Sequence, residues 1–161
     1  MYIKIIPLFL LLISCGRIEY VYKDKINSKN ELYGKTTILL SGVDIPFFFS
    51  KTIKYFGEDN KKIYLLKINT REEKIKRSVQ SNQAVSKLDY KLFFVYELFS
   101  VEKKCLINRK EIISRFTFEP QAAGYNFGSD ESLNILYETA ANDSLQQFEL
   151  YLSNIDIDSC Q

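Results

Sequence analysis

The sequence predicts an α+β domain: a four-stranded sheet with two helices packed on one face, in the order β-α-β-β-β-α. Apolar residues alternate with mixed residues over the whole stretch Leu88–Phe99, which is the period of a strand. Two other stretches, one ahead of this strand and one near the C-terminus, repeat apolar residues every three and four positions. Each predicted helix has one apolar face, so both can cover the same side of the sheet.

The first strand and the first helix follow one another closely. The stretch Thr36–Leu40 is rich in β-branched and aliphatic residues and predicts a short strand. After it, Asp44 can cap a helix, Pro46 suits the first turn, and Gly57 stands where the helix would stop. The apolar face of this helix is predicted to consist of Ile45, Phe49, Ile53 and Phe56.

The remaining strands begin at Lys61. Tyr64, Leu66 and Ile68 lie on one side of a second strand, and Lys67, Asn69 and Arg71 on the other. From Arg71 to Lys87 the apolar pattern is lost and the charge is mixed, which predicts a long, mobile connection. The strand at Leu88–Phe99 follows, with a polar turn and a hairpin partner at Leu106–Phe118.

The second helix is long. Pro120 ends the fourth strand, and the segment from Gln121 to Gly128 is a connection. Ser129 or Asp130 then caps the helix. Its apolar stripe comprises Leu133, Leu136, Tyr137, Ala140, Ser144, Phe148, Tyr151, Leu152 and Ile155.

The N-terminus predicts export and lipidation. Residues 1–14 have a lysine followed by a short apolar run, too short to span a bilayer, and small residues near its end, as in a signal peptide. Leu12-Ile13-Ser14-Cys15 resembles the lipobox of bacterial lipoproteins, in which Cys15 would be acylated and become the first residue. In bacterial lipoproteins an aspartate after the cysteine is the usual signal for retention in the inner membrane. This chain has Gly16 at that position, which favours sorting to the outer membrane. We expect residues 15–35 to form the lipidated cysteine and a tether, and residues 36–161 to form a single domain. The alternative is a plain secretory signal with an incidental cysteine.

The composition argues against an enzyme. The chain has no histidine and a net charge of only +2, so a histidine base or metal ligand is impossible and a nucleic-acid partner is not indicated. No glycine-rich phosphate loop and no Gly-x-Ser-x-Gly elbow occurs. We therefore expect no catalytic residues, no metal and no cofactor. Cys105 and Cys160 form an even pair in an oxidising compartment, where they could form a disulfide or remain as two thiols.

The sheet face opposite the helices is predicted to be open. It would show Lys67, Arg71, Lys91 and Arg115 around Phe93, Val95 and Phe99. An open, basic and aromatic face of this kind indicates that a partner binds there, although a solvated sheet face is the alternative. A second basic group, Lys74, Lys76 and Arg77, falls in the predicted connection and is expected to be a solvated loop.

The fourth strand and the second helix resemble those of the lipopolysaccharide-assembly lipoprotein family, LptE, of Gram-negative bacteria. The residues that carry the resemblance are Arg115-Phe116-Thr117-Phe118, Ala123-Gly124-Tyr125-Asn126, and a helix that opens at Ser129 and contains Ala140, Ala141 and Asp143. It covers roughly Leu88 to Ile155, together with the lipobox. The aromatic and proline-rich segment usual after the lipidated cysteine is reduced here to Arg17, Ile18 and Tyr20.

The resemblance implies a non-enzymatic subunit that plugs a large outer-membrane β-barrel, the LptD-like lipopolysaccharide translocon. Such a subunit assists assembly of the barrel and binds lipopolysaccharide on its way to the outer leaflet. The partners expected from it are therefore the barrel, lipopolysaccharide, and the membrane that holds the acyl chains of Cys15. The alternative function is that of a periplasm-facing scaffold or inhibitor that binds another protein, and a hydrolase with an unrecognised site is a remote third.

Overall fold

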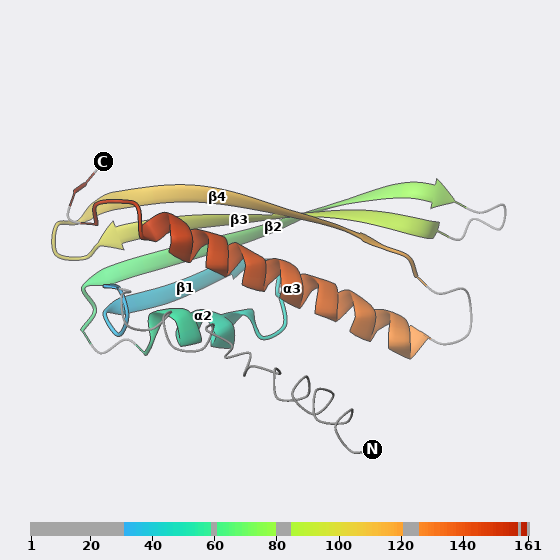
Figure 1. The fold of residues 1–161 in the computed structure, drawn as a ribbon, viewed down its shortest axis with the longest axis horizontal. Coiled ribbons are helices and arrows are strands. Elements are labelled where there is room, and N and C mark those ends of the chain that lie inside the picture. Colours follow the sequence, from blue (N-terminus) through green and yellow to red (C-terminus); the bar gives the residue numbers. More distant parts are fainter. Residues whose placement is uncertain (1–30, 59–60, 80–84, 121–125, 158, 161) are drawn as a thin grey trace, which may run out of the picture.

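The structure is a computed structural model that describes residues 31–58, 61–79, 85–120, 126–157 and 159–160. The predicted signal peptide and Cys15 lie outside the described residues. The elements follow one another as β1 (Thr36–Gly42), α2 (Phe48–Phe56), β2 (Tyr64–Val79), β3 (Val85–Ser100), β4 (Cys105–Phe118) and α3 (Asn126–Leu152) (Figure 1). This confirms the predicted α+β fold and the order β-α-β-β-β-α.

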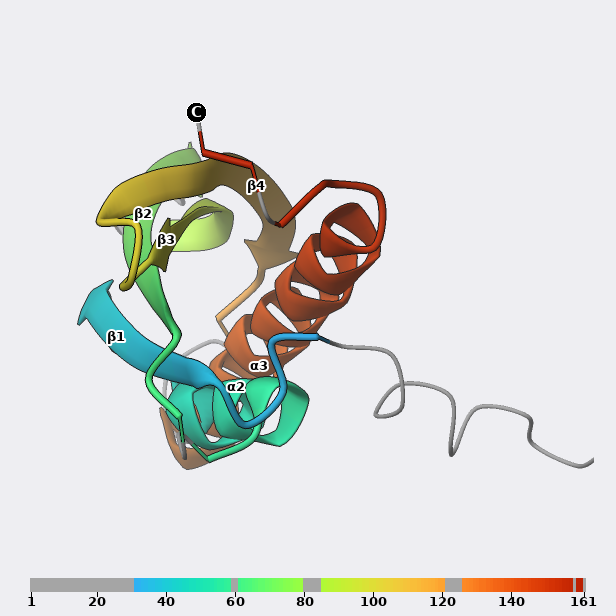
Figure 2. The same ribbon diagram turned by 90° about the vertical axis from the view of Figure 1, so that its left-hand side faces the viewer.

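The four strands form one mixed sheet in the order β1-β2-β3-β4. β1 runs parallel to β2, and the other neighbours are antiparallel. The end-on view shows α2 and α3 on the same side of the twisted sheet (Figure 2). One face of the sheet is therefore covered by helices, as predicted, and the other is open.

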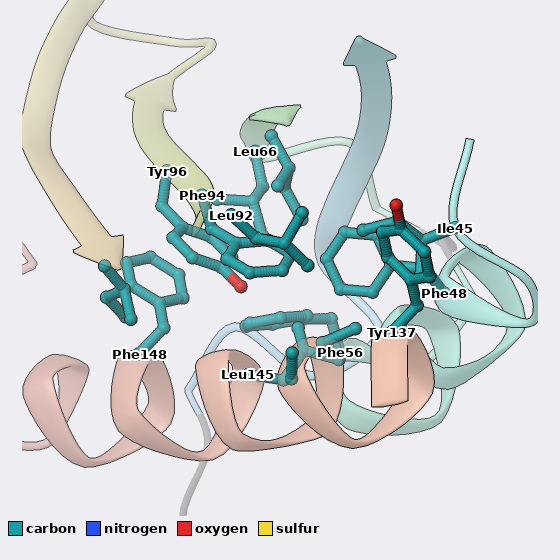
Figure 3. Close-up of a cluster of buried hydrophobic side chains, with 14 of the residues drawn as sticks. Ile45, Phe48, Phe56, Leu66, Leu92, Phe94, Tyr96, Tyr137, Leu145 and Phe148 are labelled. Atoms are coloured by element: carbon teal, nitrogen blue, oxygen red, sulfur yellow. The ribbon is translucent and has the colours of Figure 1, made fainter. Parts of the chain in front are cut away.

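The core lies between the helices and the covered face. Tyr90, Leu92, Phe94, Tyr96 and Leu98 alternate along β3 and are all buried, as the sequence pattern predicts. The ring of Phe148 from α3 stacks on Tyr96 with centroids 4.1 Å apart, and Phe48 from α2 meets Phe94 edge-on at 5.6 Å (Figure 3). Burial of such rings is the main stabilising contribution in a domain of this size.

The predicted mobile connection from Arg71 to Lys87 is wrong. β2 continues to Val79 and β3 already begins at Val85, so most of this stretch is a two-stranded antiparallel extension, which we call the β2–β3 arm. The prediction failed because this stretch has no apolar face. Its side chains form ion pairs on both faces instead. Lys74 Nζ lies 2.9 Å from Glu72 Oε1 on one face, and Arg77 forms an ion pair with Asp89 on the other.

The predicted start of the first helix is also wrong. α2 begins at Phe48; Phe47 is the N-cap residue, with φ of 59° and no capping side chain, while Asp44 is exposed and Pro46 precedes the helix. This later start changes the buried face. Phe48, Thr52 and Phe56 are buried, whereas Phe49, predicted to be in the core, is 52% exposed because it lies about 100° around the helix from Phe48.

The long helix starts earlier than predicted. α3 begins at Asn126, so Ser129 and Asp130 lie inside it and do not cap it. Short polar residues suit both the cap and the first turns, and the pattern therefore does not fix the first helical residue. The predicted stripe is largely correct, although it omits two buried residues, Ala141 and Leu145. Of the helices among the described residues, none is long and apolar enough to cross a bilayer.

Candidate ligand-binding face of the sheet

The open face of the sheet is built by the alternation of β2, β3 and β4. Each of the four predicted residues, Lys67, Arg71, Lys91 and Arg115, occupies an outward position on its strand. In the pairing register Arg71 lies opposite Phe93, and Lys91 lies opposite both Glu73 on β2 and Arg115 on β4. Since neighbouring strands are about 4.8 Å apart, Arg71, Lys91 and Arg115 are close neighbours on this face. We call these three residues the cationic cluster.

Lys67 is separate from the cationic cluster. It lies four residues before Arg71 on β2, or roughly 13 Å along the strand at about 3.3 Å per residue. Its cross-strand neighbour is Glu97, and its Nζ is 4.8 Å from the centroid of the Phe99 ring. The structure therefore brings together three of the four predicted residues and not the fourth.

Phe93 holds two of the cations in place. Its side chain is only 6% exposed, although it points to the open face, because Arg71 and Lys91 lie over it. The Arg71 guanidinium carbon is 3.9 Å from the ring centroid and Lys91 Nζ is 4.4 Å from it. Each cation–π contact contributes about 0.5–1 kcal/mol at an exposed site, and together they fix the positions of the charges.

Glu73 is a functional candidate that the sequence analysis missed. Its Oε1 accepts a hydrogen bond from Arg71 Nη1 at 2.7 Å, and its Oε2 lies 3.9 Å from Lys91 Nζ. The predicted connection contained Glu73, so this residue was not assigned to the open face. Continuing the period of two along β2, through Glu73 and Ile75, would have assigned it there. The carboxylate offsets part of the charge of the cationic cluster.

Arg115 has no such counterion. Its side chain is exposed, and no other described residue forms an ion pair with it. It also borders a shallow groove between β4 and α3 that contains Ser114, Leu136 and Asp143. Lys91 and Arg115 are therefore like charges directly opposite one another, an arrangement that destabilises a bare sheet and that a bound anion would relieve.

The second basic group does not form one site. Lys74 points to the covered face, where its hydrogen bond to Glu72 raises the pKa of the lysine. Arg77 points to the open face and pairs with Asp89. The pKa of Asp89 is lowered, first by the hydrogen bond that the Thr117 hydroxyl donates and then by Arg77. Lys74 and Arg77 therefore each have a partner of opposite charge within the β2–β3 arm.

The two cysteines lie at the opposite end of the sheet from the β2–β3 arm. Cys105 begins β4, and a disulfide joins it to Cys160, beyond the end of α3, with the Cα atoms 6.0 Å apart. This bridge holds the C-terminal segment against the β3–β4 turn. Among the described residues, no group of three histidine, cysteine, aspartate or glutamate side chains is placed to hold a metal ion.

Comparisons with known proteins identify the fold. No known family matches the chain by sequence, and no curated protein matches it. A structure of a candidate lipoprotein from Caulobacter crescentus is similar, with a TM-score of 0.53 and 11% identity over 71% of this chain and 86% of that one. A weaker similarity is to rare lipoprotein B from Shewanella oneidensis, with a TM-score of 0.45 and 11% identity over 73% of this chain and 98% of that one. Another is to a minor lipoprotein from Acinetobacter baumannii, with a TM-score of 0.49 and 12% identity over 73% of this chain and 90% of that one. The chain thus shares its fold with a bacterial protein described as a candidate lipoprotein.

Proposed function

We propose that this protein is a non-enzymatic outer-membrane lipoprotein that binds lipopolysaccharide through the open sheet face. In this proposal it acts as the plug and assembly partner of the lipopolysaccharide-transport β-barrel, held to the membrane by acyl chains on Cys15. The observation that carries the proposal is the cationic cluster, in which Lys91 and Arg115 oppose one another beside Arg71. The phosphates of lipid A are anionic groups of the kind that arginine forks bind.

The surroundings of the cluster support an amphiphilic ligand. Arg71 and Lys91 lie over the ring of Phe93, and Ile113, the neighbour of Phe93 on β4, is 36% exposed. Charged groups and apolar surface therefore lie within one cross-strand row. A mostly polar surface around a conventional core also suits a position inside a barrel, whose lumen is polar.

Charge reversal tests the site. Arg71→Glu/Arg115→Glu removes two phosphate-binding cations, and we expect lipopolysaccharide binding at fixed salt to weaken at least tenfold, at about 1.4 kcal/mol per tenfold. The matched control is Lys103→Glu/Lys104→Glu, which changes the net charge equally at exposed positions in the turn between β3 and β4, away from the open face. Equal weakening in both variants would mean a general charge effect, and unchanged binding in the first would eliminate the face.

Co-purification tests the partner. We expect the lipidated protein, extracted gently from outer membranes, to bring a large β-barrel with it in a one-to-one ratio, as measured by mass spectrometry of the complex. Recovery of the protein alone or with a soluble protein would contradict the plug proposal and favour a scaffold or inhibitor. Depletion of the barrel gives a second readout, because a plug becomes protease-sensitive without its barrel whereas an independent binding module does not.

A further inference from the structure

Three aromatic side chains near the two ends of α2 are exposed. Tyr33 is 45% exposed, Phe47 is 70% exposed and Phe49 is 52% exposed. Among the described residues, the other exposed large apolar side chains are all aliphatic and are scattered over the strands, the β3–β4 turn and α3. Exposed aromatic surface is therefore concentrated at this one part of the molecule, which we call the α2 edge.

The backbone places these residues beside the entry of the chain. Gly34 N donates a hydrogen bond to Phe56 O at 2.7 Å, so the segment before β1 meets the C-terminal end of α2, next to Tyr33. Phe47 and Phe49 lie at the other end, where they line an open hollow with Leu40 and Val43. At about 1.5 Å per residue, the nine residues of α2 separate the two ends by only about 13 Å.

Phe47 is exposed in an unusual backbone conformation. Its φ of 59° is in the left-handed region, which a bulky side chain rarely adopts. The conformation is fixed because the Phe47 carbonyl accepts hydrogen bonds from Lys51 N at 3.0 Å and from Ser50 Oγ at 2.9 Å. The chain thus holds an aromatic residue in an unfavourable conformation that directs it away from the core, a feature typical of functional surfaces.

The predicted anchor limits what this surface can contact. Cys15 precedes Glu31, the first described residue, by sixteen positions, which can span at most about 50–60 Å. A domain anchored in this way stays close to a bilayer, and its chain enters at the α2 edge. Tyrosine favours the interface of a membrane, and phenylalanine rings insert at the boundary between headgroups and acyl chains. The exposed lysines Lys54 and Lys61, near the C-terminal end of α2, suit anionic headgroups.

We propose that the α2 edge, with Tyr33, Phe47 and Phe49, rests in the headgroup region of the bilayer as a second membrane contact beside the acyl chains of Cys15. This inference goes beyond lipopolysaccharide binding, which uses the opposite face of the sheet. In a plug, the α2 edge would then lie outside the polar lumen, at the rim of the barrel beside the bilayer. The acyl chains on Cys15 supply the affinity for the membrane, and the added contact fixes the orientation of the domain on it.

The absence of tryptophan makes the contact measurable. The chain contains no tryptophan, so Phe49→Trp introduces a single fluorescent reporter at the α2 edge. Ile75→Trp is the matched control, because Ile75 is 57% exposed and lies on the open face of the β2–β3 arm. Both variants are purified as the full lipidated protein and reconstituted into vesicles of phosphatidylethanolamine and phosphatidylglycerol, with and without brominated acyl chains.

We expect the Phe49→Trp emission to shift to shorter wavelength in vesicles and to be quenched at least threefold more by brominated lipid than that of Ile75→Trp. Adding Phe47→Ser to Phe49→Trp should reduce that quenching while circular dichroism stays unchanged. Equal quenching at both positions would overturn the proposal. A blue shift without quenching would also overturn it, since a protein surface and not lipid would then cover the α2 edge. Lipopolysaccharide binding by the open face is measured separately and can fail or succeed independently.

Discussion

At the scale of single residues, Glu73 is expected to limit how strongly the cationic cluster binds the proposed anionic ligand. Its carboxylate accepts the hydrogen bond of Arg71 at 2.7 Å, so an incoming phosphate must displace it. We expect Glu73→Gln, which keeps the shape and removes the charge, to strengthen lipopolysaccharide binding about threefold to tenfold, or roughly 0.7–1.4 kcal/mol. Isothermal titration measures the change. Glu111→Gln, an exposed residue of β4 on the same face, is the control; an equal gain there would point to net charge alone.

Tyr96 and Ser144 form the other residue-scale feature, a hydrogen bond in the middle of the core. Their hydroxyl oxygens are 2.6 Å apart, and both side chains are fully buried. Tyr96→Phe leaves the Ser144 hydroxyl unsatisfied and should lower the free energy of unfolding by about 1–3 kcal/mol. Adding Ser144→Ala removes the second polar group, so the double variant should recover part of the loss. Urea denaturation of the single and double variants measures this coupling, and strict additivity would show that the bond contributes nothing of its own.

The same tyrosine predicts sensitivity to alkali. Burial raises the pKa of Tyr96 well above its usual value near 10, and the bond to Ser144 only partly opposes this. The native state therefore retains the phenol proton at pH values where the unfolded chain loses it. Its stabilising contribution is complete below about pH 10 and declines as the pH rises further. We expect the free energy of unfolding to fall less steeply above pH 10 in Tyr96→Phe than in the wild type; parallel curves would contradict this.

At the scale of elements, the sequence predicted what depends on local periodicity. β3 was predicted because its covered face is uninterrupted from Leu88 to Leu98, and both faces of β4 followed from the same period. The β2–β3 arm was not predicted, since its strands are stabilised by cross-strand pairing between residues distant in sequence, such as Arg77 and Asp89. The alternation along each strand assigned all four predicted cations to the open face, whereas the grouping of Arg71, Lys91 and Arg115 and the contact of Glu73 required the register between strands.

The junction between β1 and β2 depends on one glycine. Gly42 has φ of 100°, and a Cβ atom there would lie 1.8 Å from the Thr70 carbonyl oxygen, which accepts a hydrogen bond from Val43 N. Gly42→Ala should therefore lower the free energy of unfolding by at least about 2 kcal/mol, because the backbone must shift and the end of the parallel pair opens. Ser41→Ala, at the neighbouring exposed position, should change it by less than about 0.5 kcal/mol. Thermal unfolding compares the two, and a tolerated alanine at position 42 would contradict the described junction.

At the scale of the whole molecule, the Cys105–Cys160 disulfide joins the start of β4 to the segment after α3. The bridge connects residues 55 positions apart, and Ile155 and Ile157 of the intervening segment pack against the core. Closing a loop of this length restricts the unfolded chain by about 4 kcal/mol in the chain-entropy account, and measured effects are commonly about 2–4 kcal/mol. Domains typically have a free energy of unfolding of only about 5–15 kcal/mol. We therefore expect the disulfide to contribute a large part of the stability of this domain.

Reduction gives the corresponding test. We expect a reductant to lower the urea midpoint of the wild type to that of Cys105→Ser/Cys160→Ser, and to leave the double variant unchanged. Amide hydrogen exchange shows where stability is lost on reduction. It should accelerate in the last turn of α3 and at the start of β4, near the two ends of the bridge, before it does so in the buried middle of β3. A wild type indifferent to reductant, or exchange that accelerates first in the β2–β3 arm, would show that the bridge does not stabilise this end of the molecule.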